Sequence, residues 1–414
     1  MIQAKNRWLI ISIVFIEWVE YSLYLYLGAI LAAAFFGNDS TQSFVFIYLI
    51  FAISYLSRPF GGFIFGAFSD LIGRKKPLLI SGLIMALSTL LISVIPDFDA
   101  IGFAAPLLLL LLRFLQGVAA AGEFNNSAIL LMEYSARKRT LAGSWTGFAS
   151  SAGMFIGSLI ALICMRYFSS QSWRVAYAVV GVLSLFIFFM RRRILESPKY
   201  LAHQATEKSS PRLSTLFSEI INTAKSATLI IIVVSAFMSV YIYTCMIYFI
   251  RFFSEYSPLK DLNPLTIVSI TQALVTLIIP MMASLAEITD YKKLFQACIL
   301  LIAIMAPMLF LSSQYGSKAG LIAAIILYII ANGGISAIIF RYMFELVPTP
   351  IRCLSTSFSW SLSAAVFGST APILSSFFVA EGFLDFPWLY VTGLSILCFL
   401  VVTFSTLTNK IVDS

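Results

Sequence analysis

The sequence predicts an all-α membrane protein with twelve transmembrane helices in two pseudo-symmetric six-helix bundles. The first observation is composition: 60% of the 414 residues are hydrophobic and only 11% are charged, whereas a water-soluble globular domain carries roughly 25% charge. The second is a set of twelve apolar runs, most of them about 20 residues or longer, the length that crosses a bilayer core. The third is a weak repeat that relates the two halves of the chain.

Each transmembrane helix is expected where an apolar run is bounded by charged or turn-forming residues. In the first half the expected helices are Trp8–Phe36, Phe44–Phe65, Leu78–Ile95, Ile101–Leu131, Leu141–Met165 and Val175–Met190. In the second half they are Ala227–Phe253, Leu265–Leu285, Leu294–Leu311, Gly320–Phe344, Leu354–Val379 and Trp388–Leu407. The five cysteines occur singly, without the spacing of metal ligands, so we expect no metal and no cofactor.

The repeat is visible in the loops that follow matching helices. The segment "SDLIGRKK" of the first half weakly resembles "AEITDYKK" of the second, and "EYSARKR" weakly resembles "ELVPTPIR". Asp70 and Glu287 lie 217 positions apart, and Glu133 and Glu345 lie 212 apart, as a duplicated six-helix unit would give. We therefore predict bundles over residues 1–190 and 227–414, joined by a polar central loop over 191–226. Such repeats are typical of transporters that rock two bundles about a central site.

The distribution of Lys and Arg predicts the orientation in the membrane. Positive residues concentrate in cytoplasmic loops, and with the amino terminus inside only Arg166, Arg174, Lys260 and Lys318 fall in outer loops. We expect both termini to be cytoplasmic and the protein to be a multi-pass component of the cell (inner) membrane. The net charge of +8 then reflects topology and not a nucleic-acid-binding surface.

The stretch "GAFSDLIGRKKPLLI", Gly66 to Ile80, is a compact charged turn in an otherwise apolar region. It holds Asp70, Arg74, Lys75 and Lys76 within seven positions, and Gly73 permits a tight turn because glycine tolerates positive φ. The positive-inside rule explains the three cations, but it requires neither the aspartate nor the glycine.

This pattern resembles the signature loop of the major facilitator superfamily, G-x-x-x-D-x-x-G-R-K/R. Further segments, among them "EWVEYSLY", "LSRPFGG", "RFLQGVAAAGEF", "RRRILESPKYL" and "FELVPTPIRCLSTS", look like its metabolite:proton symporters, the group that includes proline/betaine, citrate, oxoglutarate and shikimate carriers. The resemblance covers Glu17 to about Leu374. It implies a twelve-helix fold and transport by alternating access.

The resemblance also implies a cytoplasmic gate. In this superfamily the aspartate of the signature loop interacts with the start of helix 11 and with the loop arginine. The gate residues carried over are Asp70, Gly73, Arg74, Glu133 and Arg139. In the matching loop of the second half Ala283 and Asp290 stand in place of the glycines and Glu287 in place of the aspartate, so we expect the better-defined gate in the first half.

Three acids fall well inside apolar runs, namely Glu17, Glu20 and Glu123. Intramembrane carboxylates are costly, so a functional role is the default hypothesis. The single histidine, His203, lies in the central loop, and a carboxylate must therefore carry any coupled proton. The alternative is that Glu123 or Glu17 pairs with Arg113 or Arg58 as a buried structural ion pair.

Polar and aromatic residues near these acids are candidates for substrate binding. Arg113 could bind a substrate carboxylate bidentately, and an ion pair between Arg113 and a helix 1 acid is equally open. The other candidates share helical faces with the acids or form one face of helix 7, where tyrosines could cage a quaternary ammonium although such faces more often serve packing. They are Gln116, Asn126, Tyr21, Tyr24, Tyr241 and Tyr248.

Together these features predict a proton-coupled secondary transporter and not an enzyme. We expect it to import a small carboxylate or zwitterionic metabolite, such as an organic acid, a betaine or an amino-acid-like solute. Its expected partners are that substrate, protons and the lipid bilayer, and we expect a monomer that binds no nucleic acid. Proton-driven efflux of organic cations is the alternative. A non-transporting sensor or scaffold is disfavoured because the sequence shows no appended soluble domain.

Overall fold

A computed structural model describes residues 2–37, 40–135, 137–168, 172–206, 220, 222 and 224–405. Within these ranges the chain is helical and contains no strand. Twelve helical segments are long and apolar enough to cross a membrane, which confirms the predicted number. They are Asn6–Tyr26, Leu49–Ile72, Lys75–Val94, Ala104–Glu133, Arg139–Phe168, Ser172–Arg191, Lys225–Tyr256, Pro264–Ile288, Tyr291–Gln314, Lys318–Leu346, Thr349–Ala380 and Phe386–Phe404.

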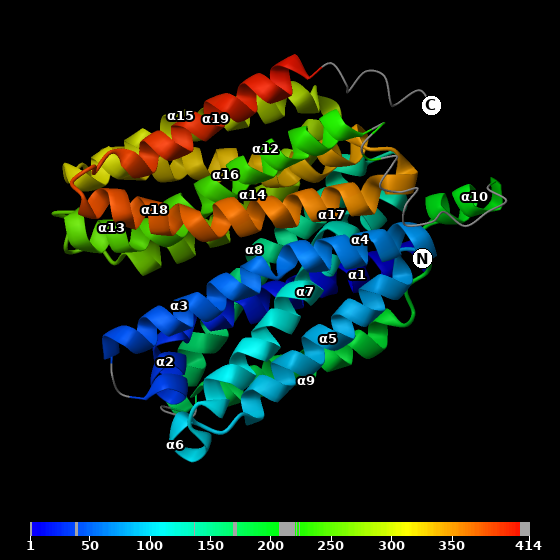
Figure 1. Ribbon diagram of the computed structural model, residues 1–414. Coiled ribbons are helices and arrows are strands. Elements are labelled where there is room, and N and C mark those ends of the chain that lie inside the picture. The colour runs from blue at the N-terminus through cyan, green and yellow to red at the C-terminus, as the bar shows by residue number, and fades with distance from the viewer. Residues whose placement is uncertain are drawn as a thin grey trace. The chain divides into compact units, whose positions relative to one another are not determined.

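The chain forms two compact units (Figure 1). Unit 1 comprises Met1–Tyr134, Ala149–Leu216 and Thr349–Ser361, and unit 2 comprises Ser135–Phe148, Phe217–Pro348 and Leu362–Ser414. Each unit thus takes one short segment from the other half of the sequence. The bundle boundaries at 190 and 227 remain a prediction, and residues 207–219 of the expected central loop lie outside the described residues.

Unit 1 is built around helix α7 (Ala104–Glu133). This helix packs against α1 (Ile2–Tyr26), α3 (Ser40–Leu56), α4 (Arg58–Ile72) and α5 (Lys75–Val94). Helix α9 (Ser172–Arg191) packs on α5 and α1, and Figure 1 shows α5 and α9 side by side. Because α7 is surrounded by other helices, its polar side chains are buried and can bond to residues of those helices.

Unit 1 also holds shorter elements: α2 (Gly28–Phe36), α6 (Phe98–Ile101), α10 (Pro198–Thr206), the 3₁₀ turn η3 (Thr349–Ile351) and most of α17 (Arg352–Ser363). Two predicted continuous helices are interrupted. The first apolar run divides into α1 and α2 at Leu27, and the second into α3 and α4 at Ser57. At the second break, the Ser57 hydroxyl donates hydrogen bonds to the carbonyls of Ser54 and Phe114. Serine side chains that bond to backbone carbonyls in this way often bend helices.

Unit 2 contains α12 (Lys225–Ile242), α13 (Phe249–Tyr256), α14 (Pro264–Ile288), α15 (Tyr291–Gln314), α16 (Lys318–Leu346), α18 (Ser369–Ala380) and α19 (Phe386–Phe404). Short π-helical stretches, η2 (Tyr243–Tyr248) and η4 (Ala364–Gly368), widen two of its spans. Helix α15 packs on α16 and α19. The long helix α8 (Arg139–Phe168) supplies its first ten residues to unit 2 and the remainder to unit 1.

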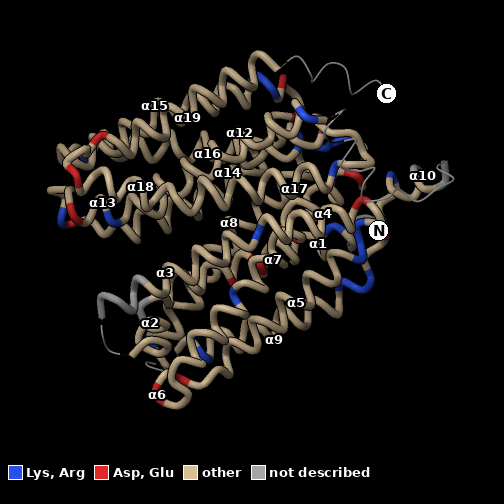
Figure 2. The backbone as a smooth tube through the Cα atoms, viewed as in Figure 1, with Lys and Arg blue, Asp and Glu red and all other residues tan. Residues whose placement is uncertain are grey.

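Charges in unit 1 are unevenly placed along the bundle. Figure 2 shows Lys and Arg gathered where α4 meets α5 and where α9 ends, near α10. The predicted positive-inside pattern places this same end at the cytoplasm. The charged turn of the signature loop therefore lies at the expected cytoplasmic end of unit 1.

Candidate functional site

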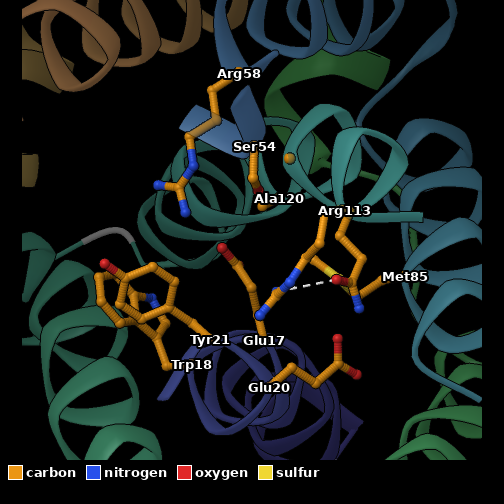
Figure 3. Close-up of a pocket in the computed structure, with 11 residues that line it drawn as sticks. Glu17, Trp18, Glu20, Tyr21, Ser54, Arg58, Met85, Arg113 and Ala120 are labelled. Atoms are coloured by element: carbon orange, nitrogen blue, oxygen red, sulfur yellow. Dashed lines mark hydrogen bonds between the residues drawn. The ribbon is translucent and has the colours of Figure 1, made fainter. Parts of the chain in front are cut away.

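A small cavity inside unit 1 brings together several predicted site residues (Figure 3). It is lined from α1, the α3–α4 break, α5 and α7 by Glu17, Trp18, Glu20, Tyr21, Ser54, Arg58, Met85, Arg113, Gln116, Gly117 and Ala120. The volume open to the centre of a water-sized sphere is about 20 Å³. A cavity of that size holds about one water molecule, so a metabolite does not fit in this conformation.

Glu17 and Glu20 are both buried, as their positions on α1 predict. Ser184 of α9 donates a hydrogen bond to Oε1 of Glu20. The Oε2 atoms of both glutamates are buried and accept no hydrogen bond from the described residues. Neither glutamate forms an ion pair within the described part of unit 1. Two carboxyl groups therefore share one water-sized cavity with Arg58 and Arg113, and neither carboxyl group forms an ion pair with a described residue.

Arg113 lines the same cavity but is already held by neutral partners. Its guanidinium donates to Oε1 of Gln116 at 3.0 Å and to the Tyr177 hydroxyl at 3.2 Å, and its Cζ lies 3.6 Å from the ring centroid of Tyr24. Gln116 in turn donates to Thr89 Oγ1 at 2.7 Å. Within the described residues, Arg113 makes no ion pair with a helix 1 acid. Figure 3 shows its side chain descending from α7 towards α1.

Glu123 has a different environment from the two helix 1 acids. It forms a bidentate pair with Arg191, with Nη1–Oε1 at 2.9 Å and Nη2–Oε2 at 3.3 Å, and both side chains are almost completely buried. Glu123 thus forms a buried ion pair, as the alternative hypothesis predicted. Its partner, however, is not Arg113 or Arg58 but Arg191, which the sequence assigns to a cytoplasmic loop. Arg191 is the last residue of α9, and the charge of Glu123 draws its side chain inward.

Gly82 of α5 makes room for this pair. A Cβ atom at this position would lie 1.6 Å from Nη1 of Arg191 and 3.2 Å from Oε1 of Glu123. Because no side chain can approach a guanidinium so closely, only glycine leaves the slot through which Arg191 reaches α7.

Four of the predicted substrate residues lie outside the cavity lining. The Tyr24 hydroxyl donates to the Ile47 carbonyl at 2.7 Å, and Asn126 donates to Ser69 Oγ at 2.8 Å. Tyr241 and Tyr248 belong to unit 2, where the Tyr241 hydroxyl donates to Oδ1 of Asn332 at 2.8 Å. Tyr21 and Gln116, in contrast, line the cavity as grouped in the sequence.

The gate residues of the first half form a second buried cluster in unit 1. Asp70 accepts hydrogen bonds from the backbone N–H groups of Cys353 at 3.2 Å and Leu354 at 2.8 Å. These donors open helix α17, the first part of the predicted helix 11. A helix amino terminus favours a carboxylate, so the contact implied by the family resemblance is present.

Arg74 connects the acids of this cluster. Its Nη1 lies 3.2 Å from Oδ1 of Asp70, and its Nε lies 3.4 Å from Oε2 of Glu133, an ion contact longer than a good hydrogen bond. Arg352 approaches Oε1 of Glu133 at 3.3 Å, and Ser197 donates to Oε2 of Glu133. Burial alone would lower the pKa of Arg74, but the neighbouring carboxylates raise it, so the residue remains a cation.

Gly73 adopts a φ of 97°, the left-handed region expected for it. Beside it, Glu196 accepts from the backbone N–H groups of Arg74 at 2.8 Å and Lys75 at 3.2 Å, which open helix α5. A Cβ on Gly73 would lie 2.3 Å from Oε2 of Glu196. Both the positive φ and the nearby carboxylate thus require glycine.

Arg139, the fifth predicted gate residue, lies in unit 2. Its guanidinium carbon is 5.7 Å from the Phe344 ring centroid, and it makes no ion pair within the described residues. The residue that completes the first-half cluster is instead Arg352, at the matching position of the repeat.

A related cluster occurs in unit 2 around Arg341. Arg341 lies 3.0 Å from Oε1 of Glu345 and 3.7 Å from Oε2 of Glu287, and it donates to Thr140 Oγ1 at 2.7 Å. Glu287 accepts from the Leu141 N–H at 3.0 Å, near the start of α8. The acids at repeat-related positions thus both bind a helix amino terminus. The second cluster is looser, since Arg341 is 22% exposed and Arg74 only 1%.

Comparison with known proteins places the chain in a family. Residues 9–352 match the sequence profile of the Major Facilitator Superfamily. The chain belongs to this superfamily. It is therefore a multi-pass membrane transporter and not an enzyme, which confirms the inference from the signature loop.

Several proteins named as transporters are similar to this chain. A Staphylococcus haemolyticus (strain JCSC1435) protein named for proline/betaine transport is 29% identical over 93% of this chain and 84% of its own. The proline/betaine transporter of Escherichia coli (strain K12) is 34% identical over 45% of this chain and 39% of its own. Among solved structures, the proton:xylose symporter XylE bound to 6-bromo-6-deoxy-D-glucose has a TM-score of 0.73 at 16% identity, over 96% of this chain and 94% of that one. The human organic anion transporter MFSD10 has a TM-score of 0.68 at 15% identity, over 97% of this chain and 99% of that one. The structural likeness supports the superfamily fold alone.

Sequence reasoning missed several residues of these clusters. Tyr177 and Ser184 of α9 contact Arg113 and Glu20, and Arg191 contacts Glu123. A signal was available: the three lie seven residues apart, with Tyr177 and Ser184 on the predicted helix and Arg191 directly after its end. Glu196 was visible only within the "RRRILESPKYL" segment, because its contact with Arg74 joins parts of the chain 122 positions apart.

Proposed function

We propose that this superfamily member is a proton-coupled importer of a small zwitterionic solute of the proline or betaine type. The observation that carries the proposal is the pair of buried glutamates on α1, Glu17 and Glu20, which share a water-sized cavity and have no ion-pair partner in the described structure. The names of the relatives supply the solute class.

A buried carboxylate that forms no ion pair is costly to keep ionised in a low-dielectric interior. In this conformation one proton or more held between Glu17 and Glu20 removes that cost. Room for a single water next to both groups would let a proton pass between them through that water. Because the cavity cannot hold a metabolite here, the proton site can be loaded separately from the solute site.

Arg113 provides the link between proton and solute. Its present partners are neutral: Gln116 lies on the same helix, α7, and Tyr177 lies on α9. Loss of a proton from Glu17 or Glu20 creates a negative charge that competes for the guanidinium, whereas protonation leaves it available to a solute carboxylate. This role combines the two alternatives that the sequence left open for Arg113.

Aromatic rings next to the acids suit a quaternary or secondary ammonium group. Trp18 contacts Tyr21 at 5.2 Å and Phe124 at 5.6 Å between ring centroids, and Phe124 contacts Trp360 at 5.7 Å. A zwitterion would place its cationic end on such faces and its carboxylate towards an arginine.

Alternating access would use the cluster of Asp70, Arg74 and Glu133 as a latch. The contact between Asp70 and the amino terminus of α17 is favoured by about 0.3–1 kcal/mol on an exposed site and up to about 2 kcal/mol when partly buried. Conformations that differ by a few kcal/mol can be switched by such a contact. We infer that both termini face the cytoplasm across the cell (inner) membrane and that the monomer suffices for transport.

The test is uptake of labelled glycine betaine and proline into proteoliposomes that contain the purified protein. An inward proton gradient should drive accumulation, and an uncoupler should abolish it. E17Q and E20Q should each lose gradient-driven accumulation. E255Q is the matched control, because Glu255 is a surface acid paired with Arg251, and it should behave as wild type.

Two outcomes would contradict the proposal. Accumulation that is unchanged by the uncoupler excludes proton coupling. Gradient-driven expulsion of lipophilic cations, with no uptake of either zwitterion, would support the efflux alternative.

A further inference from the structure

Helix α9 carries three polar side chains at a strict spacing of seven residues: Tyr177, Ser184 and Arg191. Seven residues are close to two helical turns, or roughly 10.5 Å along the axis, so the three lie on one face. All three are buried. The same helix exposes Val182, Phe186 and Phe189, so the polar stripe faces inward and the apolar residues face outward.

Each residue of this stripe contacts a different ionisable residue of unit 1. Tyr177 accepts a hydrogen bond from Arg113 at 3.2 Å. Ser184 donates to Glu20, and Arg191 pairs with Glu123 at 2.9 Å. The stripe thus reaches one buried arginine and two of the three intramembrane acids, from a helix that does not line the cavity.

Packing does not require polar residues at these positions. Burying a hydroxyl or a guanidinium is costly unless a partner satisfies it, and an apolar stripe would seal α9 against α5 and α1 at lower cost. Ser172 offers a comparison on the same helix: its hydroxyl is buried but has no partner in the described structure. Burial on α9 therefore does not by itself make a serine hydroxyl bond to an acid, and the contact between Ser184 and Glu20 is specific to that position.

We propose that the polar stripe of α9 is a positioning element for the proton site, with Ser184 as the residue that sets the pH range over which Glu20 binds its proton. This inference rests on the proposed function. A hydroxyl that donates to a carboxylate stabilises the ionised form. Without Ser184, Glu20 should hold its proton to higher pH.

Other charged and titratable groups near Glu20 remain in place when Ser184 is changed. From the helices packed around it these are Glu17 on α1, Arg58 on α4, Arg113 and Glu123 on α7, and Tyr177 and Arg191 on α9. A change confined to Ser184 therefore tests the hydroxyl contact and leaves the rest of this set intact.

The experiment compares S184A, S184T and S172A with wild type in proteoliposomes over a range of pH. S184A should move the midpoint of the pH profile of zwitterion uptake upward by about one pH unit. S184T retains the hydroxyl and should restore the wild-type midpoint. S172A removes a buried hydroxyl from the same helix without touching an acid, and its midpoint should not move.

A second readout does not depend on transport. The infrared carbonyl band of protonated Glu20, assigned by its loss in E20Q, should titrate in S184A at a higher pH than in wild type. An unchanged midpoint in both uptake and infrared titration overturns the inference alone. A wild-type protein whose uptake ignores the proton gradient would overturn the proposed function instead, and the infrared titration would still decide whether Ser184 acts on Glu20.

Discussion

Breaking the buried pair between Glu123 and Arg191 should strongly destabilise unit 1. Both side chains are nearly inaccessible to solvent, at 0% and 2% exposure, and they meet through two contacts of 2.9 and 3.3 Å. Removing one partner of a buried ion pair leaves an uncompensated charge and costs about 3–5 kcal/mol, whereas replacing both by apolar residues of similar size is often neutral. We therefore expect E123M and R191M each to lower the free energy of unfolding by that amount.

The double variant E123M/R191M should recover most of this loss. The measurement is equilibrium unfolding in mixed detergent micelles, followed by tryptophan fluorescence, with all four proteins compared in a double-mutant cycle. The coupling energy should amount to several kcal/mol. If the double variant is destabilised by the sum of the two single changes, the pair does not contribute as described and the reasoning fails.

Three further changes test the slot and the two latch clusters. G82A should abolish the pair that Arg191 forms, because its Cβ would lie 1.6 Å from Nη1, whereas G393A, whose Cβ meets no atom within 4 Å, should be neutral in the same unfolding assay. D70N should weaken the contact with the start of α17 and so expose Cys353, which is 0% accessible. The rate of maleimide labelling of Cys353 should rise about tenfold, the equivalent of about 1.4 kcal/mol. An unaltered rate would show that Asp70 does not hold α17. E287Q should have a smaller effect on transport than D70N, because its cluster is more exposed, and an equal or larger effect would contradict the ranking of the two latches.

Much of the fold follows from the sequence because membrane burial imposes a simple requirement. A segment that crosses the bilayer must satisfy its own backbone hydrogen bonds and present apolar side chains, so composition and run length suffice to predict twelve spans. The breaks at Leu27 and Ser57 were not predicted, since both runs remain apolar throughout and the bend at Ser57 depends on bonds to carbonyls that include one from α7.

The candidate site was only partly predictable. Glu17, Glu20 and Arg113 could be chosen from the sequence, because a charged residue in an apolar run is rare and expensive. Which of these charged residues form ion pairs could not be predicted from the sequence. Glu123 and Arg191 are 68 positions apart, and in the sequence only the seven-residue spacing from Ser184 distinguishes Arg191 from the exposed Arg192 and Arg193 beside it.

By itself the sequence determined the number of spans, the superfamily and the set of intramembrane charges, because each depends on hydropathy or on a short local motif. The tertiary structure decided which charges are neutralised: Glu123 is bound by Arg191, while Glu17 and Glu20 have no ion-pair partner among the described residues. The physical reason is that the cost of a buried charge depends on groups within a few ångströms, and helices that are distant in sequence supply those groups.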